Sequence, residues 1–377
     1  MLIKLLCDAF QVISGPKYDV VFYVENRSDY SHLRNLITYL SSKTDYRIQI
    51  LYSMKERPPV SVDQERVKSF YIGRGALLSY IFKTLKAKVC VMSLVDFGKG
   101  HLFRSEESVH YVHVFHALSS THVAFNQNGH SYYDTILCPG PIHKKELQLT
   151  EELYSLPNKR LIEVGYPRLD EMYKKKGKIR REIKQKMTVL IAPTWGQFSI
   201  SNNCLEDVIN SFINNDFIVI YRPHYMTIKN EFKIIEKVLK KFEENENFKY
   251  LDSAFRDELD TIDLFISDWS SAAFTYAFSY ERPVMFINTP QKILNTEYEK
   301  VGLEAIEKKL RNEIGVVAEM DQFAEFYKIG LELINSSEDY IEKIKEIRGQ
   351  YIYNLGTSLA VAGDEIIYLI ESHGESI

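Results

Sequence analysis

Residues 264–287 read LFISDWSSAAFTYAFSYERPVMFI, which combines two apolar runs with a helical segment between them. We expect strands over Leu264–Ser267 and Val284–Ile287 and a helix over Ser271–Phe278. Short apolar strands that alternate with helices are typical of parallel α/β architecture. The segment therefore predicts one strand–helix–strand unit of a parallel sheet.

Small polar residues lie where the first of these strands meets the helix. A helix start offers unpaired backbone N–H groups and a partial positive charge, and at the carboxyl end of a parallel strand it suits a phosphate. Asp268, Ser270 and Ser271 are therefore candidate residues of a phosphate site. The alternative is that Asp268 or Ser270 only caps the helix.

The same alternation fills the rest of the chain in two sets. In the first set we expect strands at Val20–Val24, Ile48–Leu51, Val89–Leu94, Tyr111–Phe115, Thr135–Cys138 and Arg160–Val164, with helices at Ser28–Leu40 and Ala76–Leu85. The second set adds strands at Thr188–Ala192 and Phe217–Tyr221 and helices at Leu205–Ile213 and Glu231–Phe242. We predict two Rossmann-like α/β domains, residues 1–172 and 187–340, joined by a basic linker over 173–186. Helices over 341–377 are expected to cross back to the first domain.

Composition supports two globular domains. The chain has 377 residues, a length that is too great for one ordinary core. Hydrophobic residues make up 45% of it. A net charge of −4 argues against nucleic acid as a partner. No run approaches the roughly 18 apolar residues of a membrane span, so membrane contact would be peripheral. Cys7, Cys90 and Cys138 lie in apolar runs and are expected to be buried thiols in a cytoplasmic protein.

A second candidate site follows the strand Phe217–Tyr221. The guanidinium group of Arg222 is permanently charged and carries several N–H donors. Pro223 ends the strand, and His224 can donate a hydrogen bond or carry charge. Because neighbouring parallel strands end at one edge of a sheet, these residues should converge with Ser270 on an anion site. The alternative is a solvated loop with an accidental histidine.

Three histidines mark a third site, in the segment HYVHVFH over 110–116. The β-branched and aromatic residues between them favour a strand, which would place His113 on the face opposite His110 and His116. That separation, like the scattered cysteines, predicts no metal site. His116 ends the strand, where α/β domains present catalytic groups, although a buried core histidine is the competing interpretation.

Other features are negative or ambiguous. Walker A, GxGxxG, GxSxG, HExxH and Asp-x-Asp patterns are absent from the sequence. The basic run from Lys174 to Lys186 is interpreted first as a solvated connector, with contact to anionic lipid as its functional alternative.

Taken in order, five motifs resemble those of the CDP-glycerol glycerophosphotransferases, enzymes of teichoic acid and related capsule polymers. They are His116, the Gly165–Asp170 stretch GYPRLD, the Ala192–Trp195 stretch APTW, Arg222-Pro223-His224, and the Ser267–Ser271 stretch SDWSS. The resemblance covers roughly residues 110–290, and residues 1–100 carry no recognisable signature. Three positions depart from the family pattern: Ala117 and Trp269 stand where Gly and Tyr are usual, and Gly196 where Arg is usual.

The resemblance implies a GT-B fold, in which two Rossmann-like domains face each other across a cleft. It implies that His116 is the general base, and that Arg222, His224, Asp268, Ser270, Ser271, Thr194 and Gly165 bind a CDP-activated donor. The implied reaction transfers glycerol or ribitol phosphate to a hydroxyl of a glycan or lipid-linked acceptor and releases CMP. The enzyme would need neither cofactor nor metal, and would work in the cytoplasm or at the inner face of the cell membrane.

Two other functions fit the same residues. One is a GT-B glycosyltransferase or a non-hydrolysing nucleotide-sugar epimerase, because a shared scaffold does not fix the chemistry. The other is a nucleotide-binding relative without catalysis, for which the departures at Ala117 and Gly196 give some ground.

Overall fold

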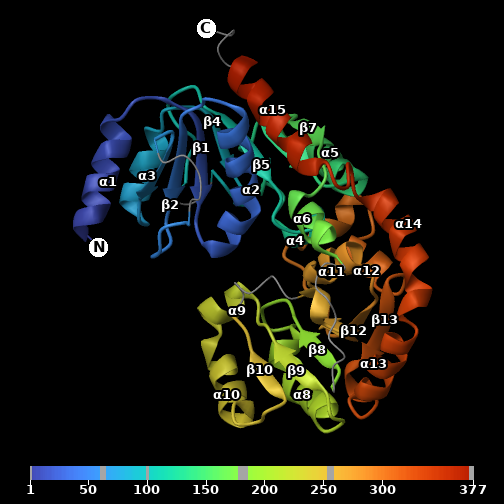
Figure 1. Ribbon diagram of the computed structural model, residues 1–377. Coiled ribbons are helices and arrows are strands. Elements are labelled where there is room, and N and C mark those ends of the chain that lie inside the picture. Colours follow the sequence, from blue (N-terminus) through green and yellow to red (C-terminus); the bar gives the residue numbers. More distant parts are fainter. Residues whose placement is uncertain (1, 60–64, 99–101, 177–185, 253–258, 373–377) are drawn as a thin grey trace.

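The computed structural model describes residues 2–59, 65–98, 102–176, 186–252 and 259–372, and it contains two parallel β-sheets (Figure 1). Within those residues the first sheet has the strand order β3-β2-β1-β4-β5-β6-β7, and the second has the order β10-β9-β8-β11-β12-β13. Each order reverses once, between β1 and β4 and between β8 and β11. Open α/β sheets bind ligands at such reversal points, beyond the carboxyl ends of the strands.

The first sheet is covered by helices on both faces. Its strands are β1 (Tyr18–Val24), β2 (Ile48–Tyr52), β3 (Val67–Tyr71), β4 (Ala87–Met92), β5 (His110–Val114), β6 (Thr135–Cys138) and β7 (Arg160–Glu163). Its helices are α1 (Leu2–Ser14), α2 (Arg27–Lys43), α3 (Ala76–Lys83), α4 (Thr121–Ala124), α5 (Pro141–Leu153) and α6 (Pro167–Lys175). Separate apolar cores form on the two faces of this sheet, one including Phe82 and Phe97 and the other Leu36 and Val112.

The second sheet has the same layered plan. Its strands are β8 (Thr188–Ile191), β9 (Ile218–Tyr221), β10 (Phe248–Tyr250), β11 (Leu264–Ser267), β12 (Val284–Asn288) and β13 (Gly315–Glu319). The helices around it are α7 (Ile200–Asn203), α8 (Leu205–Ile213), α9 (Tyr225–Asn230), α10 (Phe232–Phe242), α11 (Ala272–Tyr280), α12 (Ile306–Leu310) and α13 (Phe326–Asn335). The strand–helix–strand unit expected over 264–287 is present as β11, α11 and β12.

The C-terminal helices return to the first domain. α14 (Ile341–Tyr351) packs against α11 and α5, and α15 (Ser358–Ser372) packs against α2 and α6 (Figure 1). Asp170 on α6 anchors this return, because its carboxylate accepts hydrogen bonds from the backbone N–H groups of Gly356 and Ser358 at 2.6 and 2.8 Å. α6 extends to Lys175, into the start of the predicted linker, and residues 177–185 of that linker lie outside the described residues.

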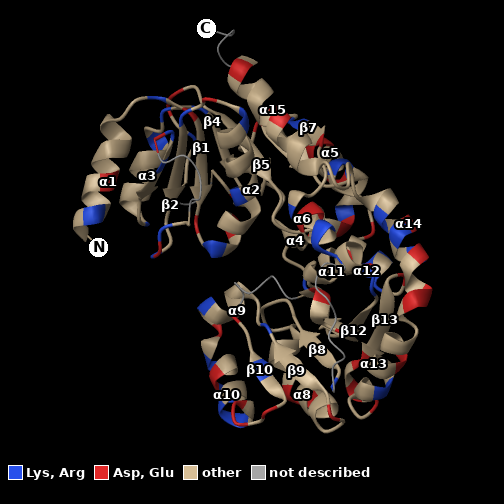
Figure 2. Ribbon diagram, viewed as in Figure 1, with Lys and Arg blue, Asp and Glu red and all other residues tan. Residues whose placement is uncertain are grey.

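One burial prediction is wrong. Cys90 and Cys138 are buried as expected, but Cys7 is exposed. Cys7 lies on α1, which packs on the core through Ala9, Val12 and Ile13, and it belongs to the outer side with the exposed Leu6 and Phe10. Figure 2 shows α1 with few charged residues along its length.

Candidate functional site between the two domains

A cavity of about 610 Å³ lies between the two domains. Its lining includes the carboxyl ends of the strands on both sides of each reversal point: β1 and β4 in the first sheet, and β8 and β11 in the second. His116, Thr194, Arg222, His224, Ser270 and Ser271 all line it. The structure thus brings together six of the eight residues that the sequence nominated for the site.

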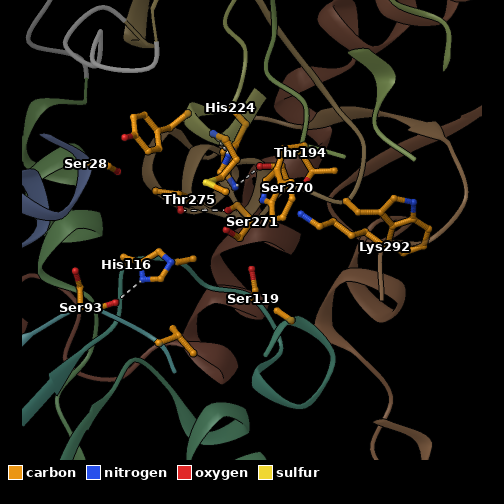
Figure 3. Close-up of a pocket in the computed structure, with 18 of the residues that line it drawn as sticks. Ser28, Ser93, His116, Ser119, Thr194, His224, Ser270, Ser271, Thr275 and Lys292 are labelled. Atoms are coloured by element: carbon orange, nitrogen blue, oxygen red, sulfur yellow. Dashed lines mark hydrogen bonds between the residues drawn. The ribbon is translucent and has the colours of Figure 1, made fainter. Parts of the chain in front are cut away.

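His116 stands on the wall contributed by the first domain (Figure 3). Its Nδ1 lies 3.0 Å from the backbone carbonyl of Ser93, and a carbonyl can only accept, so Nδ1 carries the proton. Nε2 of the neutral ring therefore has a free lone pair, and in Figure 3 this nitrogen points toward Ser271 across the cavity. Burial lowers the pKa of His116 below its usual value, while the bond to Ser93 opposes that shift. A neutral, oriented imidazole of this kind can accept a proton from a hydroxyl.

The start of α2 completes this wall. Asn26 and Asp29 form a capping box in which Asn26 Oδ1 accepts from the N–H of Asp29 at 3.2 Å, and Asp29 Oδ2 accepts from the N–H of Asn26 at 3.2 Å. Burial raises the pKa of Asp29 to about 6. The rings of His32 and His116 lie 6.2 Å apart, edge to face. The sequence prediction missed these residues, although they follow β1 as His116 follows β5.

The opposite wall begins with His224 at the start of α9. Its Nδ1 accepts a hydrogen bond from the N–H of Met226 at 3.1 Å, so the ring proton is on Nε2. Burial lowers the pKa of His224 to about 3, and nearby Lys292 and Arg222 contribute to that shift. His224 is therefore a neutral donor rather than a cation or a base, and a neutral N–H donor suits a phosphate oxygen.

The helix start predicted after β11 also opens on the cavity. Ser270, Ser271 and Thr275 line it, and α11 is nine residues long, so its N-terminal N–H groups and dipole are directed to the same space. The side chain of Ser271 makes no capping hydrogen bond, whereas Thr275 Oγ1 donates to the Ser271 carbonyl at 3.2 Å. Ser270 Oγ accepts a hydrogen bond from the Ala272 N–H at 3.3 Å, as the capping alternative predicted, and the hydroxyl of Ser271 lines the cavity without such a bond.

Asp268 does not line the cavity, contrary to the prediction. It is fully buried, and its two carboxylate oxygens accept from the N–H groups of Thr194 at 2.7 Å and Ile200 at 2.9 Å. Asp268 therefore fixes the loop after β8, and with it Thr194, rather than contacting a ligand. Burial raises its pKa, and the backbone hydrogen bonds oppose that shift.

Gly165 also lies away from the cavity lining. Its φ of +95° is in the left-handed region that favours glycine. A Cβ there would lie 2.2 Å from the carbonyl oxygen of Tyr353. Together with Asp170, this places the two ends of the GYPRLD stretch under the returning C-terminal segment, while Tyr166 and Arg168 between them line the cavity.

Lys292 is the main residue that the sequence prediction missed. It follows β12, lines the cavity, and its Nζ lies 3.4 Å from the centroid of the Trp195 indole. Burial lowers its pKa to about 7, against the attraction of Asp268 and Glu231. The rule that located Arg222 and Ser270, polar residues after a parallel strand, would have found it if applied to β12.

The domains also meet at a buried polar junction next to the cavity. His122 and Glu146 are fully buried with Nδ1 and Oε1 3.1 Å apart, and His122 Nε2 lies 3.0 Å from the Leu303 carbonyl of the second domain. Glu307, which lines the cavity, accepts from the Ser120 N–H at 3.0 Å. Burial and the nearby Glu146 raise the pKa of Glu307 to about 7.

In the described ranges, no group of three or more His, Cys, Asp or Glu side chains is arranged to hold a metal ion. No helix in these ranges is long and apolar enough to cross a membrane.

Two parallel α/β domains that direct their reversal points into one shared cavity define a GT-B protein. Residues 10–301 match the family model described as CDP-glycerol:poly(glycerophosphate) glycerophosphotransferase, which spans more than half of the chain. The chain therefore belongs to this family. It is an enzyme that transfers a polyol phosphate from a CDP-activated donor to a glycan acceptor.

Solved structures share the fold. The wall teichoic acid polymerase TagF is 17% identical with a TM-score of 0.57, over 98% of this chain and 94% of its own. A putative UDP-N-acetylglucosamine 2-epimerase from Listeria monocytogenes is 11% identical with a TM-score of 0.59, over 96% and 97% of the two chains. The UDP-GlcNAc 2-epimerase of Methanocaldococcus jannaschii is 11% identical with a TM-score of 0.57, over 93% and 99%. No curated protein sequence matches the chain.

Proposed function

We propose that the interdomain cavity is the active site and that His116 is its general base. The supporting observation is the free Nε2 of His116, which points across the cavity toward the start of α11 (Figure 3). An acceptor hydroxyl between these two features would give up its proton to Nε2 as its oxygen attacks the donor. The departure from the family pattern at Ala117 leaves this geometry intact.

The donor diphosphate is proposed to bind the wall formed by the second domain. Arg222 supplies charge-assisted hydrogen bonds, His224 a neutral N–H, and Ser271 a hydroxyl beside the helix dipole. The acceptor oxygen bonds to the β-phosphorus, the bond from that phosphorus to the bridging oxygen breaks, and CMP leaves with the electron pair. Because protein groups compensate the charge, we propose that no cofactor or metal is required.

The acceptor is proposed to be a cell-surface glycan or a lipid-linked precursor of one. Work on a lipid-linked acceptor would place the enzyme in the cytoplasm, at the inner face of the membrane. Peripheral contact would come from the basic run between Lys174 and Lys186. Residues 177–185 of that run lie outside the described residues.

The direct test is product identity. The purified protein is incubated with CDP-glycerol, CDP-ribitol or UDP-N-acetylglucosamine in the presence of membrane glycans, with His116→Ala as the control. Release of CMP together with a new phosphodiester, by the wild type and not by the variant, is expected. Release of UDP, a sugar epimer, or donor binding without any turnover would refute the proposal.

A further inference from the structure

Lys292 is a half-buried lysine directed into the cavity. Its ammonium lies against the face of Trp195, 3.4 Å from the ring centroid, and the Trp195 ring lies 6.3 Å from that of His224. In Figure 3 the Lys292 side chain extends toward Ser270 and Thr194. Three loops, after β8, β9 and β12, thus combine to hold one ammonium group beside the start of α11.

No carboxylate in the described part of the chain forms an ion pair with this ammonium, although Asp268 and Glu231 attract it from farther away. None of the ion pairs in the described part of the chain includes Lys292, and no hydrogen bond to it is found there. A charge that is partly removed from water and left unpaired destabilises the fold, so such charges are normally paired with an acid. The face of an indole compensates only in part. The arrangement is that of a site that is completed by an incoming anion.

The position within the cavity indicates which anion. His116, on the opposite wall, must lie beside the phosphorus that is attacked. Lys292 belongs to the second domain, next to Ser270, on the side proposed to hold the nucleotide. The phosphate nearest to Lys292 is therefore the one that leaves with the nucleoside.

We propose that Lys292 binds the phosphate of the departing CMP and that Trp195 holds the ammonium in position. This rests on the proposed function. When the bond between the β-phosphorus and the bridging oxygen breaks, the electron pair stays on that oxygen, and the α-phosphate gains a negative charge. The proton of the acceptor goes to His116, so the ammonium of Lys292 compensates the new charge without itself giving up a proton.

The test compares CMP and cytidine binding by calorimetry and by ligand-observed NMR. Lys292→Met is expected to weaken CMP binding on the order of tenfold or more, because a charge-assisted hydrogen bond is lost, and to leave cytidine binding unchanged. Lys292→Arg, which keeps the charge, should recover most of the loss. In single-turnover reactions with CDP-glycerol, Lys292→Met should slow the chemical step as well.

Lys229→Met is the matched control. Lys229 also lines the cavity, but it is exposed. Lys229→Met therefore changes the net charge of the protein by the same amount as Lys292→Met, but does not remove the proposed contact with the phosphate. If both methionine variants weaken CMP equally, or if cytidine binding falls with CMP binding in Lys292→Met, the inference is wrong. Unchanged CMP binding in a folded Lys292→Met protein refutes it while leaving the proposed function intact. A wild-type protein that binds neither CMP nor CDP-glycerol refutes both.

Trp195 is tested as a positioning residue. Trp195→Phe keeps an aromatic face for the ammonium, and Trp195→Leu removes it. We expect Trp195→Leu to lose CMP affinity and Trp195→Phe to keep most of it. Adding Lys292→Met to Trp195→Leu should cause little further loss. Additive losses in the double variant would show that Trp195 acts independently of Lys292.

Discussion

The two walls of the cavity differ in chemistry. The wall of the first domain carries two groups that can exchange a proton: His116, whose pKa burial lowers, and Asp29, whose pKa burial raises to about 6. The wall of the second domain carries the cation Arg222, the dipole at the start of α11, and Lys292, whose pKa of about 7 leaves it partly charged at neutral pH, together with a histidine held neutral. On the proposed assignment, proton transfer and anion binding belong to different domains, so each should be open to separate disruption.

The strongest test of this division is His116→Ala. Loss of a general base should depress turnover about 10²–10⁴-fold, while affinity for the CDP-activated donor stays nearly unchanged because the donor binds the other wall. Turnover is measured as CMP release and affinity by calorimetry.

His113→Ala is the control for this variant. His113 is buried among Phe115, His130 and Tyr133, so its loss should lower the melting temperature and leave the kinetics of the folded enzyme alone. Equal losses of turnover in the two variants, or loss of donor binding in His116→Ala, would mean that the walls do not divide the work.

The converse test is Arg222→Ala on the second wall. Removing charge-assisted hydrogen bonds to the diphosphate should weaken donor binding by about 10–150-fold. Arg222→Lys should recover part of the affinity, since it keeps the charge but loses the forked geometry. Calorimetry with CDP-glycerol decides, and an unchanged affinity would remove Arg222 from the donor site.

The pH dependence of kcat/KM also distinguishes the two walls, by a smaller effect than the substitutions above. Burial lowers the pKa of His116, so its imidazole is neutral at pH 7 and becomes protonated only below its usual value of 6.5. The kcat/KM should stay level as pH falls to that value, and then fall by up to about tenfold per pH unit as the base is lost.

Two carboxyl groups with raised pKa also face the cavity, Asp29 at about 6 and Glu307 at about 7. Asp29→Asn and Glu307→Gln variants should therefore keep the acid limb of the profile. Its disappearance in either one would assign the limb to that carboxyl group instead of His116.

The central strands were predictable from the sequence, and of the edge strands only β7 was. β1, β4, β8 and β11 each contain a buried apolar run, because helices cover both of their faces. The prediction missed β3, β10 and β13, which are edge strands. A strand paired on one side only is partly solvated, and VKSFY or FKY then lacks the continuous apolar run of a central strand.

The site followed the same logic. His116, Arg222 and Ser270 were found because a residue that follows a buried parallel strand must lie at the open edge of the sheet. That rule says nothing of side-chain direction. It could not show that the Asp268 carboxylate turns inward to the N–H groups of Thr194 and Ile200, or that Gly165 faces a segment some 190 residues away. Both depend on contacts between distant parts of the chain.

The smallest expected effect concerns one hydroxyl on the second wall. Ser271→Ala should weaken donor binding only about 2- to 10-fold, because a neutral hydroxyl contributes one hydrogen bond and the helix N–H groups and dipole remain. Thr275→Val is the matched control: it too removes a hydroxyl from the cavity lining, but one already donated to the Ser271 carbonyl. We expect its donor affinity to stay within about twofold of the wild type, as measured by calorimetry with CDP-glycerol. If Thr275→Val weakens binding as much as Ser271→Ala, then shape or helix stability, rather than a direct contact from Ser271, controls affinity at the start of α11.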